Sequence, residues 1–156
     1  MSCICGYLHF TRNLQYESYR PYLEGADVCR YNLKWSGEFI KYGENLAATR
    51  NPRIFEEPRI LVRQIPTNKN YAIEAAYVDG DQINNLNSII ISDFKVSPYY
   101  VLGIINSKLM TLWFLMKFDK FQRSIFPQFK VNELAKFPIK IDFSAKASLL
   151  IEKFRK

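Results

Sequence analysis

The sequence predicts an α+β fold, with a mixed, mostly antiparallel β-sheet, a long buried helix and a C-terminal helix. Two observations lead to this prediction. Short runs of β-branched and aromatic residues alternate with turn residues from Val28 to Ser92, as is typical of short strands. A long apolar run from Val101 to Phe118 then follows Ser97-Pro98. At 156 residues, 48 % of them hydrophobic, the chain is long enough to bury one core without disulfides or metals.

Strands are predicted from composition and from the turn residues between them. Residues 1–24 are polar and aromatic, and we expect no regular element there. Arg59–Ile65 has three consecutive apolar residues between polar ends, which is typical of a strand covered on both faces, so we place it at the centre of the sheet. Gly43–Pro58 is polar and holds two prolines, which predicts a surface connection whose arginines point outward. The other predicted strands are Val28–Lys34, Glu38–Tyr42, Tyr71–Val78 and Leu86–Ser92.

The long apolar run predicts a buried helix of about five turns. Ser97 can cap this helix, and Pro98 suits its first position because proline has no backbone N–H to satisfy. Asn106, Ser107 and Lys108 interrupt the apolar residues, and the run is shorter than the roughly 20 apolar residues that span a bilayer. A core helix is therefore expected rather than a membrane span.

Two shorter helical segments complete the predicted fold. Residues 132–136 predict a single helical turn, followed by an extended segment at Phe137–Ile141. A helix capped by Ser144 is expected to run to Lys156. We find no repeat and no linker, so residues 1–156 are predicted to form one domain, with its core in residues 23–141 and the C-terminal helix in residues 144–156.

The chain is basic, and the excess is concentrated toward the C-terminus. There are 22 Lys and Arg against 15 Asp and Glu, giving a formal net charge of +7 and a pI near 9.3. Residues 108–156 alone carry 11 basic and 4 acidic side chains. Such a surface suits a polyanion, because each Lys or Arg that neutralises a phosphate releases counterions. A solvated basic surface without a partner is the alternative.

Cysteine usage and the N-terminus indicate the compartment. The three cysteines are an odd number in a chain too large to need a disulfide framework, which fits reduced thiols. The first ten residues have no basic segment before their apolar residues and no small-residue cleavage site, so a signal peptide is not expected. We expect a cytoplasmic protein.

No catalytic or metal-binding constellation emerges from the motifs. Cys3, Cys5, His9 and Cys29 have the chemistry of zinc ligands, but their spacing matches no common pattern. Asp93-Phe94-Lys95 is similar to the end of a metal-dependent nuclease motif, yet the required upstream acid is not evident. The six glycines are scattered, so no glycine-rich loop for S-adenosylmethionine is present. We expect no catalysis, no metal and no cofactor in this chain.

Polar and basic side chains on predicted loops are the candidates for DNA contact. Arg and Lys can hold phosphates without reading the sequence, while amides and lysines can read base edges. The candidate phosphate contacts are Lys41, Arg50, Arg53, Lys120, Arg123 and Lys130. The candidate base contacts are Asn68, Lys69, Asn70, Gln82, Asn84 and Asn85. Amides are also common in turns for backbone reasons, so each loop taken alone carries little weight.

An ordered set of segments resembles a known family. In the first half the segments are Leu23–Tyr31, Trp35, Phe39–Tyr42 and Phe55–Gln64. In the second half they are Leu86–Ser88, Leu102, Ile105–Leu109, Phe126-Pro127, Lys130-Val131 and Leu134–Ile139. Together they resemble the TaqI-like C-terminal specificity domain, the target-recognition module of fused restriction and modification DNA methyltransferases. The Asn-Ser-Lys-Leu helix followed by Leu-x-x-Phe-Pro-Ile is also similar to type I restriction specificity subunits.

This resemblance implies a domain that docks on one side of double-stranded DNA and selects the recognition sequence. A methyltransferase domain, N-terminal in the same parent protein, would flip and methylate a base, usually adenine. S-adenosylmethionine, and Mg²⁺ for any nuclease domain, would belong to the parent, and no membrane partner is expected. The family leaves open which residues read bases. Arg30, Asn106 and Pro138 are expected to be structural, with Asn106 and Ser107 hydrogen-bonding a neighbouring strand or loop.

Two other functions stay open. In the first, the chain is a protein-interaction domain in which the apolar faces of Val101–Phe118 and Ser144–Lys156 bind a modification subunit, and this binding would be insensitive to salt. In the second, Asp93 and Lys95 belong to a metal-dependent nuclease. That activity would need magnesium and would be lost in the Asp93→Ala variant.

Overall fold

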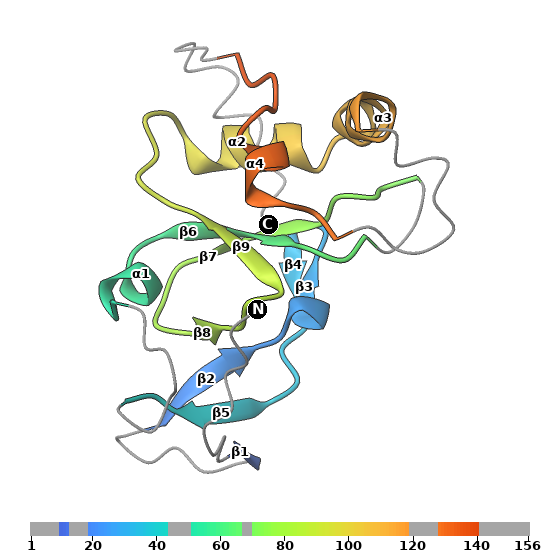
Figure 1. Ribbon diagram of the computed structural model, residues 1–156. Helices are drawn as coiled ribbons and strands as arrows, with labels where there is room; N and C mark the ends of the chain where they lie inside the picture. Colours follow the sequence, from blue (N-terminus) through green and yellow to red (C-terminus); the bar gives the residue numbers. More distant parts are fainter. Residues whose placement is uncertain (1–9, 13–18, 44–50, 67–69, 119–127, 141–156) are drawn as a thin grey trace.

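The computed structural model confirms the α+β class and its mostly antiparallel sheets (Figure 1). It describes residues 10–12, 19–43, 51–66, 70–118 and 128–140. The strands are β1 (Phe10–Arg12), β2 (Tyr19–Leu23), β3 (Val28–Cys29), β4 (Asn32–Leu33), β5 (Glu38–Lys41), β6 (Arg59–Arg63), β7 (Ala75–Val78), β8 (Ile83–Asn84) and β9 (Ser88–Ile91). The helices are η1 (Gly25–Asp27), α1 (Arg53–Glu56), α2 (Pro98–Ile105), α3 (Lys108–Lys117) and α4 (Val131–Leu134).

Strand β6 is the middle strand of the antiparallel sheet β7-β6-β9. Its residues Ile60, Leu61 and Val62 are each 0 % exposed. Ile60 and Val62 belong to the apolar cluster that includes residues of α2 and α3, whereas Leu61 packs in a second cluster with residues of β2, β3 and β7. Figure 1 shows the helices α2, α3 and α4 on one side of this sheet and the strands β2 and β5 on the other. The predicted central strand, covered on both faces, is confirmed.

The expectation that residues 1–24 form no regular element is wrong. Strand β5 pairs antiparallel with β1 and β2, and β2 also pairs in parallel with β8, which gives the sheet order β1-β5-β2-β8. Tyr22 and Leu23 of β2 are buried. The segment Tyr19–Leu23 has no clear alternation of apolar and polar residues, so its strand conformation depends on partners that come later in the chain.

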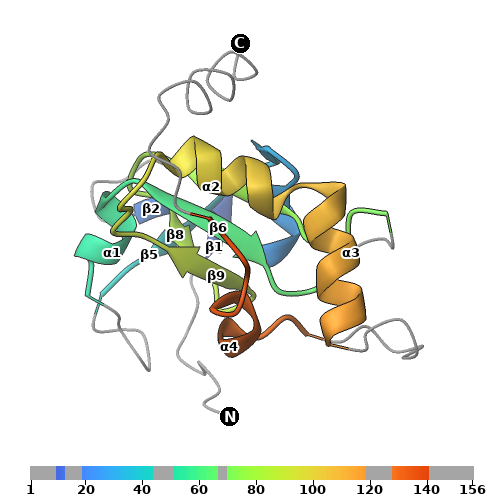
Figure 2. The same cartoon turned by 90° about the horizontal axis from the view of Figure 1, so that it is seen from above.

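The predicted long helix is two helices. α2 and α3 meet at Asn106 and Ser107, and their axes differ in direction by 61°. Figure 2, seen from above, shows this change of direction at the end of α2. The helix changes direction because Asn106 is bonded to a strand: its side chain accepts a hydrogen bond from Ala75 N and donates one to Ala75 O, both 2.9 Å long. Ser107 Oγ accepts from Met110 N and caps α3.

The bonds of Asn106 to β7 confirm the expectation that it hydrogen-bonds a neighbouring strand, whereas the Ser107 side chain bonds within α3 and not to a neighbouring strand or loop. Within the described residues, neither α2 nor α3 has the length and apolar composition to cross a membrane, and only the two together, as a bent pair, reach that length and composition.

Several other elements differ in extent from the prediction. The predicted strand Val28–Lys34 is divided into β3 and β4 by a turn at Arg30-Tyr31, where Tyr31 has a φ of 64°. The polar connection Gly43–Pro58 contains α1, whose Phe55 is buried, so that segment is not wholly on the surface. Strands β5, β7 and β9 confirm the remaining strand predictions with shorter bounds, and α4 confirms the helical turn, which begins at Val131 and ends at Leu134. The predicted helix 144–156 lies outside the described residues.

Candidate nucleic-acid interface

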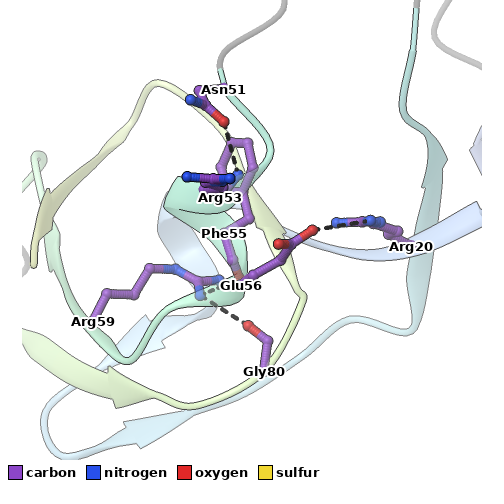
Figure 3. A network of polar contacts seen from close by, with 7 residues as sticks. All are labelled: Arg20, Asn51, Arg53, Phe55, Glu56, Arg59 and Gly80. Atoms are coloured by element: carbon purple, nitrogen blue, oxygen red, sulfur yellow. Dashed lines mark hydrogen bonds and ion pairs between the residues drawn. The ribbon is translucent and has the colours of Figure 1, made fainter.

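Arg59 joins two of the loops that were predicted to contact DNA. Its side chain is 0 % exposed at the start of β6. Arg59 Nη1 donates hydrogen bonds to the carbonyl oxygens of Phe55 at 2.5 Å and of Gly80 at 2.9 Å (Figure 3). Nη2 donates to the carbonyl of Gln82. Phe55 belongs to α1, whereas Gly80 and Gln82 belong to the loop between β7 and β8. A single guanidinium therefore holds both segments.

Arg59 carries its charge into the interior. Burial lowers the pKa of Arg59 to about 10, and the nearby Asp81 carboxylate acts in the opposite direction. The group is still protonated at neutral pH. Because a buried cation is costly unless its hydrogen-bonding groups are satisfied, the carbonyls around Arg59 are needed to keep it inside.

Three of the predicted contact residues lie on segments that are linked to Arg59, directly or through Phe55. Arg53 is exposed on α1, and its N–H donates to Asn51 Oδ1 at 3.1 Å. Gln82 is on the other loop that Arg59 holds. Lys41 is exposed at the end of β5, directly before Tyr42, whose ring packs against that of Phe55 with 5.5 Å between centroids. Lys41, Arg53 and Gln82 are called the Arg59 site below.

Carboxylates accompany the cations at the Arg59 site. Arg20 Nη2 of β2 forms an ion pair of 3.5 Å with Glu56 Oε1 of α1, as Figure 3 shows. Asp79 and Asp81 are exposed on the loop that Arg59 holds. Because both signs of charge are present, the contribution of this site to DNA binding would depend on individual side chains rather than on a broad positive field.

Asn84 does not lie on the surface. It is on β8, opposite Leu23 of the parallel strand β2, and is 5 % exposed. Its Nδ2 donates to the carbonyl of Asn85 at 3.1 Å. The interpretation of Asn84 as a base contact is therefore corrected, since a buried amide cannot reach a base edge from this conformation.

Asn85 supports the turn before β9. Its Oδ1 accepts from Asn87 N at 3.0 Å, and its backbone N–H donates to Leu23 O at 3.0 Å. Its side chain also forms a hydrogen bond with the Tyr22 phenol. Burial raises the pKa of Tyr22 and Glu24 raises it further, while the hydrogen bond with Asn85 opposes them. These contacts hold the turn against β2, so the Asn85 amide is already engaged within the protein.

Other predicted residues gather at the opposite end of β6. Gln64 follows β6; its N–H donates to Asn87 O at 3.0 Å, and its carbonyl accepts from Phe129 N at 2.6 Å. Lys130, the next residue after Phe129, is exposed. Asn70 is exposed on the loop from β6 to β7. Lys130, Asn70 and Asn87 around Gln64 are called the Gln64 site below.

Asn87 is a residue that the sequence reasoning missed. Its side chain is exposed, and it follows Asn85 by two positions in the same turn. The sequence places three amides, Asn84, Asn85 and Asn87, close together. In the structure Asn84 is buried and Asn85 is partly buried, so Asn87 is the most exposed of the three. Arg59 was also missed, because a strand end is normally a place for an exposed cation.

Five predicted contacts lie outside the described residues, and their roles stay predictions. They are Arg50, Asn68, Lys69, Lys120 and Arg123.

Asp93 and Lys95, the residues of the alternative nuclease function, form an ion pair with each other. Asp93 and Lys95 are both exposed, with 3.3 Å between Oδ1 and Nζ. In the described part of the chain, no three His, Cys, Asp or Glu side chains come together as a metal site. Cys29 is a free, partly exposed thiol, and Cys3, Cys5 and His9 lie outside the described residues.

Comparison with known proteins assigns the family. Residues 20–139, which extend from β2 through α4 and include both ends of β6, match the TaqI-like C-terminal specificity domain, and the chain belongs to this family. A protein of Methanocaldococcus jannaschii, provisionally named a type II restriction enzyme and methyltransferase, is 28 % identical over 137 residues. The aligned region covers 85 % of this chain and 11 % of that protein, so the chain spans about a tenth of the length of this relative.

Proposed function

We propose that this chain selects the recognition sequence of double-stranded DNA for a restriction-modification enzyme. The family match over residues 20–139 is the observation that carries the proposal. The geometry supports it, because polar loops that are far apart in the sequence are joined by Arg59 at one end of β6 and by Gln64 at the other. A rigid sheet with polar loops at its ends is a suitable support for reading DNA.

The two sites have different proposed roles. Exposed cations, Lys41 and Arg53 at the Arg59 site and Lys130 at the Gln64 site, would contact phosphates and position the duplex. The exposed amides Asn70 and Asn87 would read base edges, for which Asn paired with adenine is a suitable geometry. Gln82 and Asn85 would help to hold the loop before β8 and the turn before β9 in place, and would add any direct contact that they make with DNA.

The parent protein would supply the chemistry. We propose that a methyltransferase domain of the same parent flips and methylates a base, adenine in particular, and that the parent also cleaves DNA. S-adenosylmethionine would bind to that methyltransferase domain and Mg²⁺ to a nuclease domain, with no cofactor and no catalytic group in this chain. A cytoplasmic location is part of the same proposal.

The test is fluorescence anisotropy of the purified chain with randomised duplex DNA at about 50 to 200 mM salt, followed by selection of the preferred duplex. Affinity should fall steeply with salt, and selection should enrich one short sequence. A duplex affinity that is weak and independent of salt would contradict DNA binding. Strong binding with no enriched sequence would contradict target recognition.

The structure also favours one alternative function, binding to a modification subunit. α3 exposes Leu109 (76 %), Leu112 (49 %) and Met116 (69 %), which lie along one face of the helix. A partner that covers this face would bind through apolar contact, so its affinity would hardly change between low and high salt. Calorimetric titration of the chain with the methyltransferase domain tests this function. Leu109→Gln should abolish the heat of binding, whereas Leu86→Gln, which also changes an exposed leucine, should not.

A further inference from the structure

Two cations and two tyrosines form a cluster at the junction of three elements. Arg30 and Tyr31 form the turn between β3 and β4, Tyr71 precedes β7, and Lys108 is the first residue of α3. Arg30 Cζ lies 4.6 Å from the centroid of the Tyr31 ring and 4.2 Å from that of the Tyr71 ring. Lys108 Nζ lies 5.7 Å from the centroid of the Tyr71 ring. These four residues are called the Tyr31 cluster.

The charges of the Tyr31 cluster are not compensated within the described part of the chain. There, neither Arg30 nor Lys108 forms an ion pair with a carboxylate. The hydrogen bond that Arg30 makes to described residues runs from Nε to the carbonyl of Asn106, at 3.0 Å. This bond and the two rings fix the guanidinium plane, so the Nη groups are held as donors for a ligand.

Two features of the Tyr31 cluster cost stability. Tyr31 has a φ of 64°, in the left-handed region that a bulky side chain rarely adopts. Lys108 places a positive charge in the first turn of α3, where the helix dipole disfavours cations and where no acidic residue offsets it. Such features occur at ligand-binding sites as well as in tight turns, and both would be offset by an anion bound beside Lys108.

We propose that the Tyr31 cluster binds a phosphate of the DNA backbone. The Arg30 guanidinium and the Lys108 ammonium, both close to the Tyr71 ring, are donors that form charge-assisted hydrogen bonds with a phosphate. A phosphate beside Lys108 also suits the N-terminal end of α3, where the helix dipole favours an anion. Tyr71 directly follows Asn70, so this contact places the duplex beside a residue proposed to read bases. The proposal rests on the proposed function and assigns to Arg30 a role beyond the structural one.

The test compares single-charge variants of the full chain by anisotropy with randomised duplex DNA across the salt series. Lys108→Gln should lower the slope of log affinity against log salt by about 0.9, the value for one lost phosphate contact. The affinity lost between 50 and 200 mM salt should then shrink by about three- to fourfold, equally for all sequences. Lys117→Gln is the matched control, since Lys117 is an exposed lysine at the other end of the same helix; it should keep the parental slope.

Arg30→Gln should lower the slope in the same way, and its thermal unfolding temperature reports on the lost bond to Asn106. If that variant does not fold, Lys108→Gln decides, because it removes no hydrogen bond to the described residues. A parental slope in Lys108→Gln overturns the phosphate site while salt-dependent binding by the parental chain still supports the proposed function. Salt-independent binding by the parental chain overturns both.

Discussion

Arg59 shows how one side chain can organise a surface from within. An exposed arginine on a strand end contributes little to stability, but this one is buried and its Nη groups donate to carbonyls from two separate segments. A neutral apolar side chain at this position would leave those carbonyls without donors. The position of α1 relative to the loop before β8, and with it the geometry of the Arg59 site, therefore depends on a residue that need not touch DNA.

Arg59→Met tests this dependence. We expect the free energy of unfolding to fall by about 3 kcal/mol or more, because the buried carbonyl of Phe55 and the partly buried carbonyls of Gly80 and Gln82 lose their donor at once. Urea denaturation of the parental chain and the variant measures the difference. Arg53→Ala is the control: it also removes an arginine from this region, but an exposed one, and its effect should stay within about 0.5 kcal/mol. Equal stability of the two variants would contradict the role of Arg59.

Tyr22 predicts a loss of stability at alkaline pH. Its pKa is raised above 10.0 in the folded chain, chiefly by burial. In the unfolded chain the phenol ionises near pH 10, while the folded chain keeps its proton to a higher pH, so the unfolding free energy falls as pH rises above about 10. Tyr22→Phe should remove this component. Denaturation at pH 8 and pH 11 should show a smaller loss in Tyr22→Phe than in the parental chain; an equal loss would contradict the shift.

At the level of elements, a single amide decides the path of the helical layer. The apolar residues from Val101 to Phe118 are consistent with a continuous helix, yet the helix ends at Ile105 because Asn106 bonds to both backbone groups of Ala75. α3 then starts anew from the Ser107 cap. The bend lets Met110 and Phe114 enter the same apolar cluster as Ile105, against β6 and β7.

Substitutions of the two residues at the bend between α2 and α3 should lower the free energy of unfolding by different amounts. Asn106→Ala leaves the buried N–H of Ala75 unpaired and removes one of the two donors to its carbonyl, which keeps the bond from Tyr31 N; the unfolding free energy should fall by about 2 to 3 kcal/mol. Ser107→Ala removes only a helix cap and should cost about 1 kcal/mol. Urea denaturation of both variants gives the comparison. If Ser107→Ala is the more damaging, the bend is held mainly by the cap and not by Asn106.

The sequence predicted those elements whose conformation follows from a few neighbouring residues. Three consecutive apolar residues identified β6 as the central strand, and the turn Val131–Leu134 was recognisable from its own residues. Strand β2 was not, because its pairing with β5 and β8 is decided by distant residues. The same pairing buries Asn84, which in isolation has the composition of an exposed turn. For the candidate site, composition found exposed Arg53, Asn70 and Lys130 but not their supports, Arg59 and Gln64.

Across the whole molecule, contacts at the two ends of β6 and at the Tyr31 cluster would give the duplex several points of attachment. They come from α1, the loops flanking β7, the turn before β9, the segment before α4 and the start of α3. Because these segments are tied to one sheet, their spacing is fixed before DNA arrives, which reduces the ordering cost of binding. Substitution of a residue that contacts phosphate and substitution of one that contacts a base should then change DNA affinity in different ways.

Asn70→Ala and Arg53→Ala test this difference. Loss of the Asn70 amide should change discrimination at one base pair by about 1 to 3 kcal/mol, because a base-edge contact is removed. Arg53→Ala should weaken binding to all sequences alike and reduce the salt dependence. Competition between the selected duplex and its single-substitution variants measures both effects. Uniform weakening by Asn70→Ala would show that this residue does not read a base.

The bond from Arg30 to the carbonyl of Asn106 joins residues 76 positions apart, and the pairing of Leu23 in β2 with Asn84 in β8 joins residues 61 positions apart. During synthesis, β2 therefore emerges from the ribosome well before its partner β8 exists. Tyr22 and Leu23 stay uncovered until β8 has been made, and the turn at Arg30-Tyr31 gains its anchor only after Asn106 follows. Folding of this domain should thus be late and slow relative to its translation, as is expected for chains dominated by distant pairings.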